Sequence, residues 1–543
     1  MSTQQQQQQQ TQKNEQDLVL FTVGDKSNPY NFPSWKKWMI FTIVGLNMTW
    51  AMMLSTIVVP ATLRYQQEFD IKEITSKVPI MTYLLGYSVG PVLIIPISED
   101  YGRKPIGIAS LIMLYIFNIP QGVAKNVETL AVTRFIAGIF ASPMLNYVCL
   151  VPDLWRGGDK AGLWGVNIWA FMAESVVLGG VIGDYIVARY DWRLTIWIPM
   201  AVGGFLLILF AILVPETRPA PILNKRTKKV RQKENPNAWT IYEAKRSWNT
   251  IFRETVIRPP VMFFTEPIVL FFAIYDGINY GLIYLLIESM PLVYEELGLD
   301  APNNSLFYFA MEVGFVIALG CYYFQLKAEE WAERRWGKHR QPEYKLFWGM
   351  LSCIAFPVTM YWYGGTGRQG FSYWLPTCAI GLFGWSSHIL FMIVSDYTID
   401  SYQMLASSAV TGQSFCREIM AATCALVTTT FYNWSYNDVQ GPYRHTYAIA
   451  SYILGGIATL CMAIPFIFYF FGPRIRAASH YSLELKRLTE EEIAREKWIE
   501  ERSEAITREH EHQEEAVRTV QGDREGSPCE KDKEPLEKVA EEV

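Results

Sequence analysis

Apolar segments of about 20 residues recur through most of the chain and are separated by short polar stretches. A helix of that length spans the hydrocarbon core of a bilayer, which is about 30 Å thick. Several segments contain Gly or Pro, which membrane helices tolerate. The chain is therefore predicted to be an all-α membrane protein and not a soluble enzyme. We expect twelve membrane helices, at residues 39–59, 78–98, 106–124, 129–151, 162–187, 194–214, 261–288, 305–325, 346–364, 373–397, 406–432 and 447–471.

A polar, strongly basic stretch at residues 215–260 divides the predicted helices into two sets of six. This division predicts two pseudo-symmetric six-helix bundles, at 39–214 and 261–471, joined by a cytosolic linker. Residues 1–38 contain a glutamine run and are expected to be a disordered cytosolic N-terminus. Residues 472–543 are expected to be a charged, partly helical cytosolic tail. Its helix is either solvated or a binding element for a partner.

Lys and Arg residues are unevenly distributed between the predicted loops. They are concentrated in the basic linker, at 327–345, and in the turns that contain Arg103 and Arg156, all on one side. Because cytosolic loops are enriched in basic residues, we expect both termini in the cytosol; the first outer loop, which is also basic, is an exception. Glycosylation triplets at Asn303 and Asn433 fall on the predicted outer side.

Charge, cysteine content and missing motifs argue against several classes of function. The formal net charge of −5 gives no indication of a nucleic-acid partner. Most of the eight cysteines lie in or beside apolar segments, and no CxxC pair suggests a metal or disulfide framework. The sequence contains no Walker phosphate loop, no Ser-His-Asp constellation and no TVGYG-like filter. We therefore expect no enzyme, no ATP-driven pump, no channel, no metal and no cofactor.

A charged turn, SEDYGRKPIG, separates the second and third predicted helices. A turn this tight needs glycine, and charges near helix ends can pair with each other, with helix dipoles or with the other bundle. The stretch IPISEDYGRK resembles the signature Gly-x-x-x-Asp-x-x-Gly-Arg-Lys/Arg of the major facilitator superfamily. This resemblance implies a conformational gate, and a positively charged membrane anchor is the alternative. The gate residues would be Glu99, Gly102, Arg103 and Lys104.

Other stretches resemble the fungal-type branch of twelve-helix drug:proton antiporters in that superfamily. They include NPYNFPSWKKW, LAVTRFIAGIFASP, VPETRPAPILNKRTKKVR and EPIVLFFAIYDGINYGLIYL. The resemblance implies the major facilitator fold and export coupled to protons. The fifth helix reads AESVVLGGVIGDY and lacks the proline of the antiporter motif, which leaves the direction of transport open. Gly179 and Gly183 in that stretch are still expected to form a face for close helix packing.

Charged residues inside the predicted membrane helices mark candidate functional positions, because each costs about 2.5–3.5 kcal/mol at bilayer depth. For Arg134 the resemblance implies a role in proton transfer, and a packing salt bridge is the alternative. Asp276 shares a helix face with Tyr280 and Tyr284, where an acid can bind a cation, carry a proton or simply accept hydrogen bonds. The four expected proton-coupling or transport residues are Arg134, Glu174, Asp276 and Glu312.

The remaining membrane charges are expected to have lesser roles. Glu288 would lie near the outer interface, where water lowers its cost. Arg417 and Glu418 are adjacent, so we expect them to point in different directions on their helix. His388 is expected to be a packing or hydrogen-bonding residue.

Taken together, the residues and the resemblance predict a monomeric secondary transporter that works by alternating access. Solute would bind between the two halves, in a cavity lined by Trp169, Tyr275, Tyr280 and Tyr284. Its expected partners are a small-molecule substrate, protons and the lipid bilayer. The expected function is proton-coupled export of small amphipathic organic compounds (a drug, a secondary metabolite or a polyamine) at the plasma membrane, with the vacuolar membrane as the other location. A metabolite importer or facilitator of the same fold, or a transporter-like membrane sensor, are the alternatives.

Overall fold

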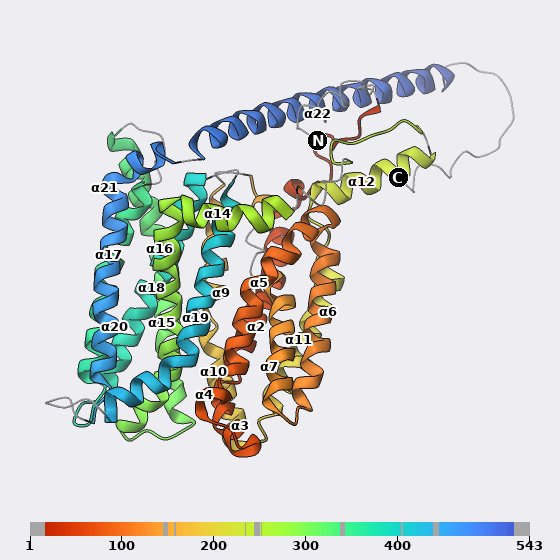
Figure 1. Ribbon diagram of the computed structural model, residues 1–543. Helices are drawn as coiled ribbons and strands as arrows, with labels where there is room; N and C mark the ends of the chain where they lie inside the picture. The colour runs from red at the N-terminus through yellow and green to blue at the C-terminus, as the bar shows by residue number, and fades with distance from the viewer. Residues whose placement is uncertain are drawn as a thin grey trace.

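Two bundles of long helices stand side by side in the computed structural model (Figure 1). Helices account for the regular structure of the described residues, which contain no strand beyond one isolated bridge between Leu18 and Trp239. The structure describes residues 17–525 apart from 145–149, 157–158, 234, 244–249, 251, 337–342, 403–404, 438–444 and 480. Of the N-terminus predicted to be disordered at 1–38, residues 1–16 lie outside the described residues, as do the last residues of the tail. Residues 17–38 are structured and include η2 (Pro29–Asn31) and the start of α2, so the prediction is wrong for them.

The N-terminal half is built from the first six membrane segments, drawn red to yellow in Figure 1. The fourth predicted helix, 129–151, is α7 up to Ala141, and residues 145–149 of that range lie outside the described residues. The fifth is not one helix, because it breaks at Ser175 and Val176. The segments are α2 (Ser34–Thr56), α5 (Val78–Tyr101), α6 (Arg103–Gly122), α7 (Val127–Ala141), α9 (Lys160–Glu174) with α10 (Val177–Arg189), and α11 (Leu194–Leu213). Short helices between them are η3 (Val59–Ala61), α3 (Thr62–Phe69), α4 (Glu73–Ser76) and α8 (Leu150–Leu154).

The C-terminal half is drawn green to blue and contains the other six segments (Figure 1). The predicted start of the seventh helix at residue 261 is wrong, because the chain forms α14 (Arg258–Thr265), turns at Glu266 and starts again at Pro267. Proline is well suited to the first turn of a helix, where its missing N–H is not needed. The segments are α15 (Pro267–Glu296), α16 (Tyr308–Trp336), α17 (Glu343–Thr366), α18 (Trp374–Tyr402), α19 (Ala406–Asn437), and α20 (Ala448–Cys461) with α21 (Ala463–Ala477).

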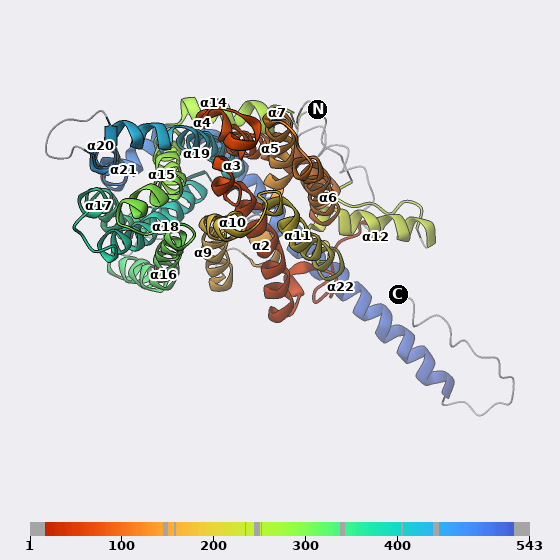
Figure 2. The same ribbon diagram turned by 90° about the horizontal axis from the view of Figure 1, so that it is seen from below.

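Length and apolar composition identify eleven helices of the described chain as able to cross a membrane. The twelfth, α19, has 32 residues and is long enough, but Arg417, Glu418 and its many hydroxyl side chains make it less apolar. It lies among the other long helices and packs along α15 and α5 (Figures 1 and 2). The predicted all-α architecture of twelve helices in two bundles is therefore confirmed.

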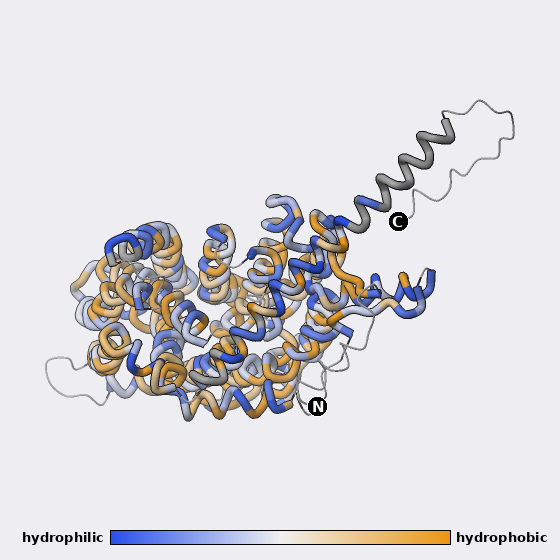
Figure 3. Tube along the Cα trace, turned by 90° about the horizontal axis from the view of Figure 1, so that it is seen from above, coloured by the Kyte–Doolittle hydropathy of each residue, from blue (hydrophilic) through white to orange (hydrophobic). Residues whose placement is uncertain are grey.

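The helices divide into an inner and an outer set. In α15 and α18, 78% of the most apolar stretch is buried inside the protein, against 28% in α11. The outward face of α11 is correspondingly apolar, with Phe205, Ile208 and Ile212 exposed. Hydrophobic residues run through the bundles in Figure 3, whereas α12 (Pro219–Lys233) and the described start of α22 (Ser482–Glu525) are largely hydrophilic. Outer helices thus present an apolar surface to lipid, and polar helices lie at one end.

Close packing of α10 on α2 depends on two glycines. A Cβ atom on Gly179 would overlap the carbonyl oxygen of Met53, and one on Gly183 would overlap that of Ile57. The predicted small-residue face of the fifth helix is therefore confirmed.

Three segments far apart in the sequence meet at the end of the molecule that carries α12 and α22. The backbone of Leu18 pairs with that of Trp239, and Leu18, Leu20 and Trp239 form a small cluster to which Ile506 of α22 adds. Ser503 of α22 also donates a hydrogen bond to the carbonyl of Phe21, at 2.7 Å. The long helix α22 starts at the C-terminal half and extends across this end (Figure 1).

Candidate functional site

A stripe of four side chains on α15 faces the boundary between the two halves. Asp276, Tyr280, Tyr284 and Glu288 follow one another at intervals of four residues, which places them on one helix face. The hydroxyl of Tyr284 lies 2.7 Å from that of Ser55 in α2. The shared face that was predicted for Asp276 and the two tyrosines is therefore present, and it extends one turn further to Glu288.

Lys77 closes the stripe at the end that carries α3 and α4. Lys77, at the start of α5, forms an ion pair with Glu288 and also contacts Thr429 of α19. Lys77 is 5% exposed and Glu288 7%, so the predicted wetter location of Glu288 is wrong: α15 continues past it and buries it. The sequence singled out Glu288 but not Lys77, because only the fold shows that this loop lysine meets α15.

Arg417 is the centre of a second group of charges. Its Nη1 lies 3.5 Å from Oδ2 of Asp276, and its Nε and Nη2 each lie 3.3 Å from Oε1 of Glu418. The prediction that Arg417 and Glu418 point apart is wrong, because the long guanidinium side chain bends back to its neighbour. Tyr280 and Phe391 each place a ring 5.2 Å from the guanidinium carbon. Two buried carboxylates therefore share one guanidinium, which leaves one negative charge in excess when all three are ionised.

Arg134 is buried and its hydrogen bonds run to backbone oxygens. Its Nε donates to the carbonyl of Pro79 at 2.9 Å, and its Nη2 to that of Leu54 at 2.7 Å. The ring of Tyr83 lies 4.8 Å from the guanidinium carbon. Arg134 thus joins α7 to α2 and α5 within the N-terminal half.

The break in the fifth helix brings Glu174 to the other half. At the broken turn α2 donates to two backbone carbonyls, from Thr49 to Met172 at 3.1 Å and from Thr56 to Val176 at 2.6 Å. Glu174, the last residue of α9, contacts His388 of α18, with 2.5 Å between Oε2 and Nδ1. Ser175 donates a hydrogen bond to Glu312 of α16 at 3.4 Å.

The expected cavity residues separate into two places. Tyr280 and Tyr284 contact each other in an edge-to-face arrangement, with 5.4 Å between ring centres, at the boundary of the halves. Trp169 of α9 stacks on Phe391 of α18, also across that boundary, with 6.0 Å between centres. Tyr275 lies elsewhere, with its hydroxyl near the thiols of Cys353 and Cys461 inside the C-terminal half.

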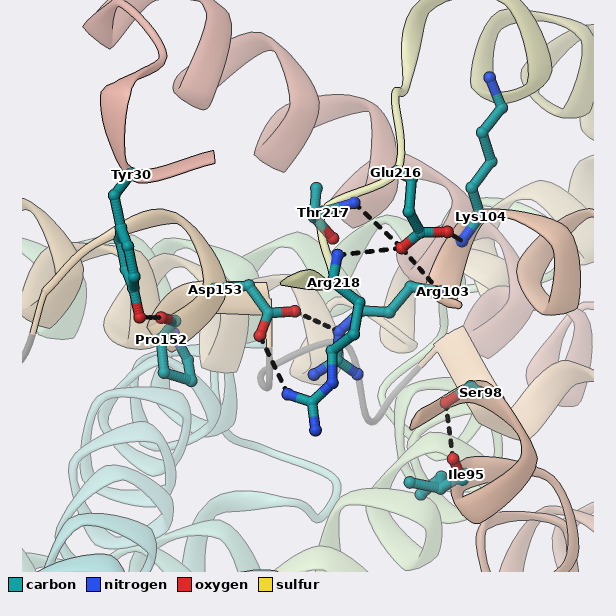
Figure 4. Close-up of polar contacts among 10 residues, drawn as sticks. All are labelled: Tyr30, Ile95, Ser98, Arg103, Lys104, Pro152, Asp153, Glu216, Thr217 and Arg218. Atoms are coloured by element: carbon teal, nitrogen blue, oxygen red, sulfur yellow. Dashed lines mark hydrogen bonds and ion pairs between the residues drawn. The ribbon is translucent and has the colours of Figure 1, made fainter. Parts of the chain in front are cut away.

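The charged turn between α5 and α6 is held by two carboxylates that the sequence did not single out (Figure 4). The side chain of Glu216 accepts hydrogen bonds from the first two N–H groups of α6, Arg103 at 3.0 Å and Lys104 at 3.1 Å. An anion at a helix N-terminus satisfies free donors and the helix dipole. Asp153, just after the fourth membrane segment, pairs with Arg103 and lies 3.3 Å from Nη1 of Arg218.

Gly102 makes this turn possible. Its φ of +106° and ψ of +152° belong to a region that is almost exclusive to glycine, and a Cβ atom there would overlap the carboxylate of Glu216. Glu99 lies one turn earlier on α5 and is half-buried. The contacts of Asp153 and Glu216 with this turn join parts of the N-terminal half, so they brace that half as a unit.

The C-terminal half repeats this arrangement with other residues. Lys345, in the first turn of its third membrane helix, pairs with Asp400 at 2.7 Å and with Asp396 at 3.8 Å near the end of its fourth. Glu343 pairs with Arg476, in the last turn of α21, at 2.8 Å. Each half therefore ties the start of its third helix to the end of its fourth and sixth.

The predicted glycosylation residues lie at the end of the molecule opposite to α12 and α22. Asn303 is exposed at the start of η6 (Asn303–Phe307), and Asn433 is half-buried in the last turns of α19. Among the described residues, no group of three or more His, Cys, Asp or Glu side chains is arranged to hold a metal ion.

Comparison with known proteins agrees with this architecture. The chain is 30% identical over 477 residues to the citrinin biosynthesis cluster transporter mrr1 of Monascus ruber, covering 84% of this chain and 91% of that protein. It is 28% identical over 488 residues to the multidrug transporter TPO1_2 of Candida glabrata, covering 87% and 81%. The fold resembles that of the proton:xylose symporter XylE, with a TM-score of 0.57 and 13% identity, covering 81% of this chain and 97% of that one.

The sequence profile of one family covers most of the chain, from residue 40 to residue 425. This match includes the N-terminal half from within α2 onward, the linker and the C-terminal helices as far as α19. The chain belongs to the Major Facilitator Superfamily of membrane transporters.

Proposed function

We propose that this transporter exports small amphipathic organic compounds in exchange for protons, by rocking its two halves about the boundary between them. The observation that carries the proposal is the buried charge group of Asp276, Arg417 and Glu418 beside that boundary. A carboxylate in excess of its guanidinium needs either a proton or a cationic group on the substrate to be neutral, and it cannot hold both equally well. Competition between the two is the simplest basis for exchange.

The aromatic residues around this group favour a substrate that is partly apolar. Tyr280 and Phe391 flank Arg417, and Trp169 stacks on Phe391 from the other half. Aromatic faces bind both apolar and cationic groups. A drug, a secondary metabolite or a polyamine fits this chemistry, and two relatives are named for multidrug transport and for a biosynthesis cluster.

We assign the four membrane charges different parts in this cycle. Asp276, Glu174 and Glu312 are the proton-accepting candidates, because each lies at or near the boundary of the halves. Arg134 would keep α2, α5 and α7 in register through its carbonyl contacts. Arg103, Lys104 and Gly102, with Glu99 on the same turn, would hold the cytosolic end of the N-terminal half in one piece while it moves.

We further propose that the transporter acts as a monomer in the plasma membrane, with both termini in the cytosol. Basic α12 and the charged α22 would then lie on the cytosolic side, and Asn303 and Asn433 outside. Import of a metabolite through the same fold is the second candidate. The fifth helix favours it in one respect, since its break occurs at Ser175 without the proline of the antiporter motif.

The test is accumulation of a panel of fluorescent or radiolabelled amphipathic compounds in cells with and without the chain. Export predicts lower accumulation of at least one compound in cells that carry the chain. Asp276→Asn should raise it toward the level of cells that lack the chain, whereas Glu295→Gln, an exposed acid on the same helix, should behave as the parent. Higher accumulation in cells with the parent chain would favour import, and transport by Asp276→Asn equal to the parent would contradict the assigned role.

A further inference from the structure

Glu174 and His388 meet across the boundary between the halves in a contact that the proposed cycle does not yet explain. Nδ1 of His388 lies 2.5 Å from Oε2 of Glu174, and Nε2 lies 3.0 Å from Oδ1 of Asn167. Glu174 and Asn167 come from α9, and His388 comes from the middle of α18. Each of the three side chains is at most 1% exposed, so water does not complete their hydrogen bonds.

The amide of Asn167 fixes which ring nitrogen of His388 carries a hydrogen. Its Nδ2 donates to the carbonyl of Leu319 in α16, at 3.3 Å, which orients the amide oxygen toward the ring. An amide oxygen can only accept, so Nε2 of His388 has to be the donor. A neutral ring in this state presents the lone pair of Nδ1 to Glu174.

A second proton is therefore needed between His388 and Glu174. An ionised carboxylate only accepts hydrogen bonds, and so does an Nδ1 without hydrogen. Two acceptors do not approach to 2.5 Å in a buried site without a hydrogen between them. The proton can lie on Nδ1, giving an imidazolium and a carboxylate, or on Oε2, giving a carboxylic acid that donates to a neutral ring.

We propose that Glu174 and His388 form a one-proton clamp that holds α9 against α18, and that loss of this proton separates the two halves at this level. The proposal rests on the proton coupling proposed above and adds the place where a proton is tied to the conformation. With the proton bound, the pair attracts; without it, a carboxylate faces a lone pair and the contact is repulsive. Closure of the halves and uptake of one proton are then a single linked equilibrium.

Three further charged groups surround the pair and need to be separated from it. Glu312 comes from α16 and contacts Ser175, next to Glu174. Arg417 from α19 and Asp276 from α15 also act on Glu174 electrostatically, but they pair with each other. Glu312 is thus the carboxylate whose titration is most easily mistaken for that of the clamp.

The clamp can be tested without any substrate, because the proton is the ligand. Spin labels would be placed at Lys160 of α9 and Arg334 of α16, whose side chains are 79% and 82% exposed in opposite halves, in a variant whose native cysteines are replaced. Distances between the labels would be measured in lipid nanodiscs between about pH 5.5 and about pH 8.5, the range in which histidine pairs exchange protons. Because the closed state holds one proton more, the ratio of short to long distances should fall with rising pH, by at most about tenfold per pH unit.

Two substitutions should each abolish this pH dependence, one by fixing the short distance between the labels and the other by fixing the long distance. The amide N–H of Glu174→Gln can donate to Nδ1 as the protonated acid does, so this variant should keep the short distance at both ends of the pH range. His388→Phe keeps a ring but removes the acceptor, so it should show the long distance throughout. Glu295→Gln, at an exposed acid of α15 with no part in the clamp, is the matched control and should retain the shift of the parent. Glu312→Gln separates the neighbouring carboxylate from the clamp itself.

The proposal is overturned if the parent shows the same distances over the whole pH range. It is equally overturned if Glu312→Gln abolishes the shift while Glu174→Gln retains it. A failure of the compound panel would leave these distances unaffected, so the proposed function and the clamp can fail separately.

Discussion

At the scale of single residues, the boundary between the halves relies on buried charges that are paired across it. Lys77 and Glu288 lie in different halves and are both almost fully buried. Removing one partner of such a pair leaves the other charge without compensation, at a cost of about 3–5 kcal/mol, whereas replacing both by apolar groups is often close to neutral. The pair therefore closes this end of the molecule only while both residues are present.

A double-mutant cycle measures this coupling. Lys77→Met and Glu288→Met alone should each clearly lower the melting temperature of the purified protein. The decrease in the double variant should be much smaller than the sum of the two single decreases. Thermal unfolding of the parent, the two single variants and the double variant in the same detergent would measure these decreases. Additive losses in the double variant would mean that the two side chains do not act as a pair.

Sequence patterns predicted which residues belong to the site better than they predicted which side chains those residues contact. The helical period placed Asp276, Tyr280 and Tyr284 on one face, because four-residue spacing is local information. The same reasoning separated Arg417 from Glu418 wrongly, since it follows Cβ directions and ignores how far a guanidinium can reach. Lys77, Asp153 and Glu216 were missed as partners because their contacts join segments between 50 and 211 residues apart.

At the scale of elements, the turn between α5 and α6 joins two sequence motifs that are distant in the chain. Glu216 belongs to the stretch VPETR after the sixth membrane segment and caps the helix that starts at Arg103. Helix ends at such turns are the places where local sequence carries most information, and the need for glycine at residue 102 was predicted from it. The break in the fifth helix was not predicted, because neither Ser175 nor Val176 is a helix breaker and the apolar run continues through them.

Gly102→Ala tests how much this turn contributes. Alanine at a backbone conformation of this kind costs about 1–3 kcal/mol, and its methyl group would displace the Glu216 carboxylate. We expect a lower melting temperature and weaker transport. Gly204→Ala is the matched control, because that glycine of α11 has open space around it and should tolerate a methyl group. Equal stability of the two variants would show that the turn adapts without cost.

At the scale of the whole molecule, two braced halves meet along a boundary that contains ionisable groups. The ties at Arg103 and at Lys345 lie within their own halves, whereas the contacts of Glu174, Glu288 and Tyr284 cross between them. A structure with strong ties inside each half and ionisable contacts between them is suited to rigid-body rocking. The two-bundle architecture followed from the segment lengths and from the basic linker that divides the segments, but which side chains cross the boundary depends on the packing of the complete fold.

Transport against a gradient in reconstituted vesicles is the most direct test of this account. Purified protein in liposomes would be given a compound that the panel identifies, with and without an imposed pH difference. We predict that the pH difference drives accumulation of the compound on the more acidic side, and that a protonophore abolishes it. Accumulation that is unchanged after the pH difference has been collapsed would contradict proton-coupled exchange.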